Sequence, residues 1–437
     1  MLIVENILWL LVLIGVMILI HELGHFLAAR FFDVRVDAFS FGFGPRLFGF
    51  RRGETDFRVS AIPFGGYVKM AGEQPGDDAA GDPRTFVAKP RWQRLVIAFA
   101  GPFMNIALAV ALLAGLFLYK YPKPMASDAV ANIGHVMPDS PAASAGLREG
   151  DRIVRIDGAS DPSWEDVTIK ELSNPNRPLA VEVDRQGQRL SVTVTPSLAE
   201  KVGVGYAGWA QQAEIQVVEV SPGLPAEKAG LLPGDLLLSV NGERIRSRYK
   251  LQEVIRASEG KPVDVDFIRE GKRRSVIIQP EFSQAEKRWM IGVAPDHRIV
   301  YTRLSLPEAL AQSVRQNVRG ATLIYELLRS IVARRMSAKS LDGPIRIAQL
   351  SGEAAREGAY TYINLMAAVS LNLAVLNLLP IPILDGGVIL MLLFEMLIRR
   401  DLSMPVKEAV FKFGFVFLVM LMVFVIYNDI TKMLPSG

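Results

Sequence analysis

Four apolar stretches of the sequence are long enough to cross a lipid bilayer as helices. The first contains no charged residue between positions 7 and 20. Such uniform apolarity is typical of membrane spans, whereas a surface helix of a soluble domain alternates polar and apolar faces. The sequence therefore predicts an α-helical membrane core, with spans at about residues 7–29, 95–119, 363–383 and 410–427.

Charges beside these stretches predict their orientation. Lys and Arg gather after the first span, before the second, and between the third and fourth, and such residues favour the cytoplasmic side. Both short connections are therefore expected in the cytoplasm, and both termini and the long segment between spans two and three outside. Spans one and three then run in the same direction and end at a similar depth. The residues concerned are Arg30, Arg35, Arg51, Arg52, Lys89, Arg91, Arg94, Arg399, Arg400 and Lys407.

The long extracytoplasmic segment contains an internal repeat. Residues 141–158 return without gaps as residues 225–242, and both share the pattern Pro-Ala-x-x-Ala-Gly-Leu-x-x-Gly-Asp. Two copies predict two similar domains, each with a short helix, a Gly-Asp turn, an alternating strand and an Asp-Gly or Asn-Gly turn. The pattern resembles PDZ domains, which bind extended peptides at a sheet edge. Copies that act only as spacers are the alternative, because a fold does not fix a function.

Two further regions carry regular patterns. Residues 57–70 alternate around Pro63 and the pair Gly65 and Gly66, which predicts a β-hairpin on the cytoplasmic side. Residues 306–336 place apolar side chains at helical spacing with arginines elsewhere, which predicts an amphipathic helix. This helix would lie on the outer membrane surface or pack against the repeat domains.

Composition agrees with a membrane protein and restricts the chemistry. Half of the 437 residues are apolar and the mean hydropathy is positive. The net charge of +4 predicts no nucleic-acid partner, because the cations beside the spans account for much of it. The chain has no cysteine, so a zinc ion would have to be held by His, Asp or Glu.

The strongest chemical signal is His21-Glu22-Leu23-Gly24-His25, at the end of the first span. On a helix this spacing puts both imidazoles one turn apart on one face, where they can bind the same zinc ion, with Glu22 beside them as a general base. Ionisable groups are expensive inside a membrane and are usually functional there. A chance match on a buried or signal helix is the alternative.

A catalytic zinc usually takes a third protein ligand, and Asp385 is the candidate. It follows the third span, which the predicted orientation brings to the depth of His25. Pro380 and Pro382 break the helix before it, and the glycines after it allow close backbone approach. Irregular backbone in a membrane is tolerated where it lines protein or a water-filled cavity, and hydrolysis needs water. An Asp that caps a turn at the membrane interface is the alternative.

These motifs together resemble the site-2 protease family of intramembrane zinc metalloproteases. The resemblance rests on His-Glu-x-Gly-His, on Gly101-Pro102-x-x-Asn105, and on Asn377-x-x-Pro380-x-Pro382-x-Leu-Asp385-Gly. It implies that His21, His25 and Asp385 bind Zn²⁺ and that Glu22 is the general base. It also implies a membrane-dipping hairpin that pairs with substrate as an added strand. The substrate contacts expected on this basis are Asn377, Asn105, Pro380, Pro382, Phe57, Val59, Ala61, Gly65 and Gly66.

The resemblance further implies a function and a location. The expected protein is a multi-pass protease of the bacterial inner membrane, with both termini and the PDZ domains in the periplasm. Its expected substrates are single-span proteins: an anti-sigma factor of envelope stress signalling after a first cut by another protease, and remnant signal peptides. Peptide ligands of the PDZ domains and the lipid bilayer are the other expected partners. A non-enzymatic PDZ-bearing membrane scaffold with a structural metal is the alternative.

The expected fold class is a multi-domain membrane protein. It combines an α-helical core of four spans with a membrane-associated β-hairpin region and two extracytoplasmic PDZ domains of the α+β type. The expected order is a first span, the β region, a second span, two PDZ domains, an amphipathic connector, and two final spans. The boundaries are 1–30, 31–93, 94–120, 121–208, 209–298, 299–357, 358–398 and 405–430.

Overall fold

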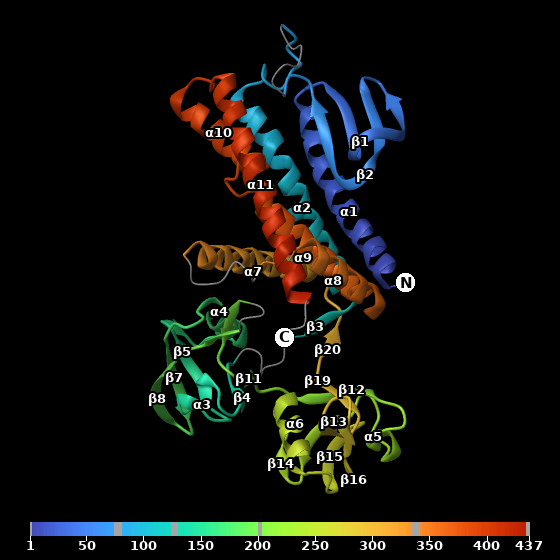
Figure 1. Ribbon diagram of the computed structural model, residues 1–437, viewed down its shortest axis with the longest axis vertical. Coiled ribbons are helices and arrows are strands. Elements are labelled where there is room, and N and C mark those ends of the chain that lie inside the picture. The colour runs from blue at the N-terminus through green and yellow to red at the C-terminus, as the bar shows by residue number, and fades with distance from the viewer. Residues whose placement is uncertain are drawn as a thin grey trace. The chain divides into compact units, whose positions relative to one another are not determined.

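The computed structural model describes residues 2–73, 81–123, 130–199, 203–333, 341 and 343–433. The chain divides into two compact units, shown in Figure 1. We call residues 1–121, 303–328 and 341–437 the membrane unit, and residues 122–302 and 329–340 the repeat unit.

The membrane unit is mainly helical. Its elements are α1 (Leu2–Phe31), β1 (Val36–Arg52), β2 (Thr55–Met70), α2 (Arg91–Tyr119), α7 (Leu306–Val332), α8 (Pro344–Glu357), α9 (Ala359–Asn377), α10 (Asp385–Ile398) and α11 (Met404–Met433). Among the described residues, four of these helices are long and apolar enough to cross a membrane: α1, α2, α9 and α11. These helices and the β-rich regions confirm the predicted fold class.

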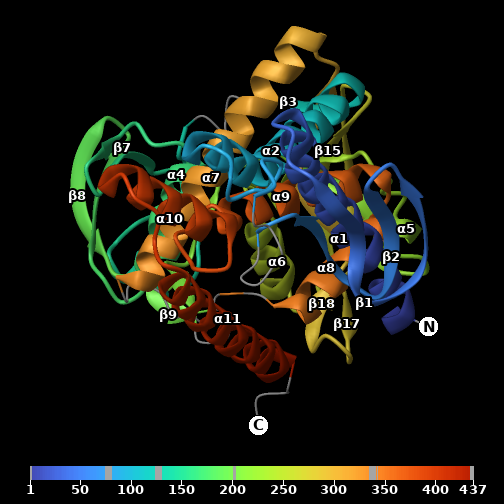
Figure 2. The ribbon, with the colours of Figure 1, turned by 90° about the horizontal axis from the view of Figure 1, so that it is seen from above.

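Helix α2 has three helical neighbours in this unit. It packs against α1, α9 and α10. Figures 1 and 2 both show the β1–β2 sheet beside α1, on the side away from α10. The long predicted amphipathic helix is α7, and residues 334–336 of that prediction lie outside the described residues.

The third apolar stretch breaks earlier than its hydropathy predicts. Helix α9 ends at Asn377 instead of reaching residue 383, and a new helix, α10, starts at Asp385. Pro380 and Pro382 lie in the connection, where they cannot donate backbone hydrogen bonds to a continued helix. A Cβ on Gly386 or Gly387 would lie 2.2 or 2.3 Å from a carbonyl oxygen of the connection. The predicted close backbone approach is therefore present, and it fixes the start of α10.

The hairpin predicted within residues 57–70 is wrong. The turn lies between Arg52 and Thr55, and residues 57–70 belong to one long, bent strand, β2. Phe39 of β1 pairs with Phe57 on one side and with Val68 on the other. The two halves of the predicted hairpin are thus separated by β1. A local turn signal could not reveal this, because the pairing partner is contributed from outside the stretch.

The repeat unit contains two domains of the same construction, which we call repeat domain 1 (131–211) and repeat domain 2 (215–297). Repeat domain 1 contains β4 (Ile133–Val136), α3 (Pro141–Ser144), β5 (Arg152–Ile156), β6 (Ala159–Ser160), α4 (Trp164–Ser173), β7 (Leu179–Arg185), β8 (Gln188–Val194), β9 (Ser197–Ala199), β10 (Val204–Tyr206) and β11 (Trp209–Gln211). Repeat domain 2 contains β12 (Ile215–Val220), α5 (Pro225–Lys228), β13 (Leu236–Val240), β14 (Glu243–Arg244), α6 (Arg248–Ala257), β15 (Val263–Arg269), β16 (Lys272–Ile278), β17 (Glu281–Ser283), β18 (Arg288–Met290) and β19 (Val293–His297). β3 (Tyr121–Lys123) pairs with β20 (Val300–Thr302).

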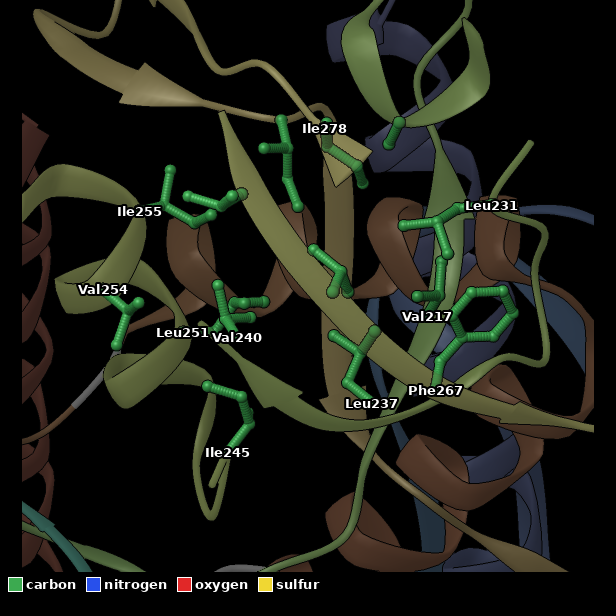
Figure 3. Close-up of a cluster of buried hydrophobic side chains, with 14 of the residues drawn as sticks. Val217, Leu231, Leu237, Val240, Ile245, Leu251, Val254, Ile255, Phe267 and Ile278 are labelled. Carbon is green, nitrogen blue, oxygen red and sulfur yellow. The ribbon is translucent and has the colours of Figure 1, made fainter. Parts of the chain in front are cut away.

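Sheet pairing locates the border between the two domains. Strand β11 pairs with β4, just as β19 pairs with β12 in the second copy. Residues 209–211, which the sequence places in the second domain, therefore belong to the first. The order β16-β15-β13-β12-β19 forms the main sheet of repeat domain 2, and α6 packs on its core. Figure 3 shows this core, with Leu251, Val254 and Ile255 of α6 gathered beside the strand residues.

Candidate metal centre

The two histidines lie where α1 is in close contact with α2. A Cβ on Gly24 would lie 2.3 Å from the carbonyl oxygen of Ala100 on α2. Gly24, between Glu22 and His25 in sequence, therefore permits a contact that a larger residue would prevent. His21 and His25 are both buried, at 7% and 8% exposure. The spacing of four residues puts them on the same face of α1, as predicted.

Three side chains from two helices converge at this point. His21 Nε2 lies 3.1 Å from Asp385 Oδ2, and His25 Nε2 lies 3.3 Å from Asp385 Oδ1. The two Nε2 atoms are 3.3 Å apart. Asp385 is the first residue of α10, so the proline break in the chain carries its carboxylate directly to the histidines.

The position of His25 is fixed from both ends of its ring. Its Nδ1 donates a hydrogen bond of 2.9 Å to the carbonyl oxygen of Ile97 on α2. A Cβ on Gly101 would lie only 2.2 Å from His25 Nε2. With Nδ1 protonated, Nε2 carries the free lone pair that a metal needs. Gly101 leaves room for that nitrogen at the centre of the site.

Two asparagines surround His21. The side-chain nitrogen of Asn105 lies 3.3 Å from His21 Nδ1, and that of Asn377 lies 3.4 Å from His21 Nε2. Asn105 is fully buried, and its Oδ1 has no hydrogen-bond partner. The two ends of an amide are assigned from such networks. Turning the Asn105 amide over would let Oδ1 accept a hydrogen bond from the Nδ1–H of His21, which leaves Nε2 with the free lone pair that a metal needs.

This donor set fits a catalytic zinc ion. The ligand atoms of His21, His25 and Asp385 all lie within 4.8 Å of one another. Two imidazoles and one carboxylate are a ligand set of catalytic zinc, which keeps a further position for water or substrate. Closed structural zinc sites favour four protein ligands. Within the described residues, three His and acidic side chains gather here.

Glu22 lines a cavity of about 310 Å³ together with both histidines, Asp385 and Asn377. Glu73, which the sequence did not point to, lines the same cavity and accepts a 3.4 Å hydrogen bond from the Met70 N–H. Glu73 is exposed as a residue, while desolvation of its carboxyl, which faces the cavity, raises its pKa to about 7. The cavity thus brings the Glu22 carboxyl and the Asn377 amide to the three candidate metal ligands.

Of the predicted substrate contacts, one lines the cavity, one lies beside Glu22 outside the lining, and the others lie away from the lining. Asn377 lines the cavity, and Gly66 lies beside Glu22, because a Cβ there would be 3.2 Å from Glu22 Cγ. Phe57 instead packs edge-on against Phe26, in the cluster that joins the sheet to α1. The described lining of the cavity does not include Asn105, Pro380, Pro382, Phe57, Val59, Ala61, Gly65 or Gly66.

Two residues that the sequence did not reveal make hydrogen bonds to side chains or backbone of the site. Ile97 acts through its carbonyl oxygen, which any residue type would offer, so no sequence signal exists. Ser370 on α9 donates a 2.8 Å hydrogen bond to the carbonyl oxygen of Asn105. The sequence could have indicated this contact, because a serine within an apolar span often forms a hydrogen bond to a neighbouring helix.

Known proteins resemble this chain over almost its whole length. Protease RseP of Yersinia pestis is 30% identical over 459 residues, which cover 98% of this chain and all of that protein. A protein of Neisseria meningitidis named as a candidate zinc metalloprotease is 30% identical over 440 residues, 96% of this chain and 97% of its own length. Among solved structures, a PDZ domain of an SdrC-like protein of Listeria monocytogenes matches 20% of this chain and 90% of its own, at 20% identity and a TM-score of 0.18.

The sequence profile described as peptidase family M50 matches residues 9–421. This match includes the four candidate spans in large part, both repeat domains and the three converging side chains. The chain therefore belongs to peptidase family M50 and is a multi-pass zinc metalloprotease.

Proposed function

We propose that this protease cleaves the transmembrane segments of single-span proteins, with His21, His25 and Asp385 as zinc ligands and Glu22 as the general base. The observation that carries the proposal is the convergence of these groups on one cavity, from helices that also form the candidate membrane spans. Membership of a metalloprotease family argues against the non-enzymatic scaffold. The predicted structural metal is also not favoured, because three ligands beside a cavity suit catalysis.

Each side chain then has a distinct role in peptide hydrolysis. A bound zinc ion supplies a Lewis acid that acidifies water and polarises the scissile carbonyl. Glu22 takes the proton of the attacking water and passes it to the leaving amine. Ile97 and Asn105 hold the two imidazoles with Nε2 toward the cavity. Asn377 presents its amide at the same wall, where it can bind a substrate carbonyl.

A helical substrate hides its amides in its own hydrogen bonds, so it must be unwound before cleavage. The unwound backbone needs new partners, because unpaired amides are costly in a membrane. We propose that β2 supplies them near Gly66, where this strand passes beside Glu22. Addition of a substrate strand to a sheet edge is a known form of peptide recognition.

The finer biological setting is also a proposal. The charge distribution favours an orientation with both termini and the repeat unit in the periplasm of a bacterial inner membrane. The family resemblance favours an anti-sigma factor trimmed by a first protease, and remnant signal peptides, as substrates. The similarity to Protease RseP agrees with both proposals.

Cleavage by purified protein in detergent tests the proposed function. Wild type should cut a single-span substrate within its apolar segment, as read by product masses. Glu22→Gln should lower the rate about 10³-fold while zinc stays bound, because it removes only the proton acceptor. A zinc chelator should abolish cleavage. Normal turnover by Glu22→Gln would refute the assignment of the base.

A further inference from the structure

One carboxyl on the wall of the cavity has no part in the proposed chemistry. The acidic and imidazole side chains that line this cavity are His21, Glu22, His25, Glu73 and Asp385. All except Glu73 have proposed roles as metal ligands or as the general base. Among the described residues, the partner of the Glu73 carboxyl is a backbone N–H at 3.4 Å, and no cation pairs with it. Since an ionised carboxylate can accept several hydrogen bonds, most of its capacity is unused.

The backbone that carries Glu73 is held in place. The Ala71 N–H donates a 2.9 Å hydrogen bond to the carbonyl oxygen of Arg35, and the Phe86 N–H donates one of 2.8 Å to the carbonyl oxygen of Ala71. Phe86 lines the same cavity. Glu73 follows two residues after Ala71, and its carboxyl turns back to the level of the Met70 N–H. The carboxyl is therefore part of a built cavity wall at the end of β2.

The arginines joined to this segment by backbone hydrogen bonds already have acidic partners. Arg35 pairs with Asp82 at 2.9 Å, and Arg84, whose carbonyl oxygen accepts from the Arg35 N–H, pairs with Glu54 at 2.6 Å. A carboxyl away from water is costly to ionise, and a nearby opposite charge offsets that cost. A cation for Glu73 would therefore come from a molecule bound in the cavity.

A single-span substrate carries such cations beside its apolar segment. Side chains of Val68, Met70, Phe86 and Ile97 give the cavity an apolar wall that suits residues of a span. Lys and Arg flank natural spans on the cytoplasmic side. Glu73 belongs to the connection between α1 and α2, which the charge distribution predicts to be cytoplasmic. A substrate span in the cavity would thus bring its flanking cation toward this carboxyl.

The geometry of β2 predicts how far this cation lies from the cut. In the described part of the chain, residues 62–70 pair with β1 alone, so their other edge can take the proposed substrate strand. Gly66 lies beside Glu22, and Met70 follows four residues later, about 13 Å along a strand. Because the Glu73 carboxyl lies at the Met70 N–H, a substrate residue about four positions from the scissile bond would lie opposite it.

We propose that Glu73 is a specificity residue, which binds a Lys or Arg side chain of the substrate about four residues from the scissile bond on its cytoplasmic side. The inference rests on the proposed function and names the substrate class of the same site. Spans in which a basic residue follows the cut at this distance are the preferred substrates, and spans with an acidic residue there are excluded.

The test is a competition between two substrates in one reaction, with the purified full chain in detergent. The parent substrate is a single span without charged residues near its cut. Its derivatives carry one Lys or one Glu, placed in turn about three to six residues from the cut on either side. Product masses give the ratio of the two kcat/KM values. Wild type should prefer Lys over Glu at least tenfold at one or two adjacent positions on the cytoplasmic side.

Two substitutions assign this preference to Glu73. Glu73→Gln should reduce it to within about twofold, because the amide keeps the shape and loses the charge. Glu73→Lys should reverse it, so that the Glu substrate is cut faster, and a merely structural role of Glu73 cannot produce a reversal. Glu408→Lys is the matched control, since it makes the same charge change on α11, outside the described lining of the cavity. It should keep the wild-type preference.

The outcomes separate this inference from the proposed function. Cleavage of the parent by wild type without any preference between Lys and Glu overturns the inference alone. The inference is also overturned if Glu73→Gln keeps the preference, or if folded Glu73→Lys does not reverse it. If size-exclusion chromatography shows that Glu73→Lys does not fold, Glu73→Gln and the position scan decide the question. A wild type that does not cut the parent overturns the proposed function, and this inference with it.

Discussion

Two aspartates, the half-buried Asp385 in the membrane unit and the buried Asp235 in the repeat unit, have different kinds of partner. Asp235 is 1% exposed, and it accepts hydrogen bonds from Arg269 Nε and Nη2, both at 2.6 Å, and from the Leu232 N–H at 2.9 Å. Asp385 is 20% exposed and lies beside a cavity, and its partners among the described residues are imidazole nitrogens.

The surroundings of each carboxylate determine its role. Arg269, besides its contact with Asp235, donates a 2.8 Å hydrogen bond to the carbonyl oxygen of Gly230. The Asp235 cluster is closed and complete, so it stabilises a fold. The partners of Asp385 are imidazoles, which are common metal ligands in proteins, and a cavity adjoins the site. A carboxylate with an incomplete set of partners beside a cavity is therefore the better candidate for function.

Removal of Asp385 should have the largest effect. Asp385→Ala leaves two protein ligands, and catalytic zinc sites need three. We expect zinc content to fall well below one ion per chain and cleavage to fall below detection. Metal analysis of purified protein measures this. Asp401→Ala is the matched control, because that carboxylate lies in the same unit and pairs with Arg91 and Arg94 instead of histidines. A normal zinc content in Asp385→Ala would remove this residue from the site.

Removal of Asp235 should affect stability and leave zinc alone. Asp235→Ala leaves the Arg269 guanidinium and the Leu232 N–H without their buried acceptor, which destabilises repeat domain 2 by about 3 kcal/mol. Hydrogen exchange of the full chain should show faster exchange over residues 215–297, with residues 131–211 unchanged. Asp151→Ala is the reciprocal control, because Asp151 accepts equivalent hydrogen bonds from Arg185 at 2.7 and 2.8 Å. Loss of zinc in either variant would contradict this separation of roles.

Substitution of Asn105 should have an intermediate effect, because Asn105 contacts the proposed ligand His21 and is not itself a proposed ligand. Asn105→Ala removes the partner of His21 Nδ1 and frees the imidazole to change tautomer. Zinc affinity should fall about 10-fold to 100-fold. Competition with a chelator of known affinity measures the change. Unchanged affinity would show that the position of His21 is fixed by α1 alone.

The sequence pointed to the three side chains that gather in this candidate site, although the orientation of the spans stays a prediction. His21 and His25 follow from a spacing of one helical turn, and Asp385 follows from the parity of the spans and the proline break. The glycines after Asp385 have the predicted close approach. The repeat was visible because both copies keep the same turn residues.

The rest depends on contacts between distant segments. The position of β1 between the two halves of β2 requires pairing with residues outside the predicted hairpin. The acceptor of His25 is a backbone carbonyl, so the identity of Ile97 carries no signal.

The smallest expected effect tests how far the support of the site extends. Ser370 lies two contacts from His21, because its hydroxyl binds the carbonyl oxygen of Asn105 and not its side chain. Ser370→Ala removes one buried hydrogen bond, worth about 1 kcal/mol, and leaves the Asn105 amide in place. Zinc affinity should therefore fall no more than a few fold, against 10-fold or more for Asn105→Ala. The same chelator competition measures both variants side by side. Equal losses in the two would mean that α9 positions the metal ligands directly, and that the site depends on the packing of the spans as strongly as on its own side chains.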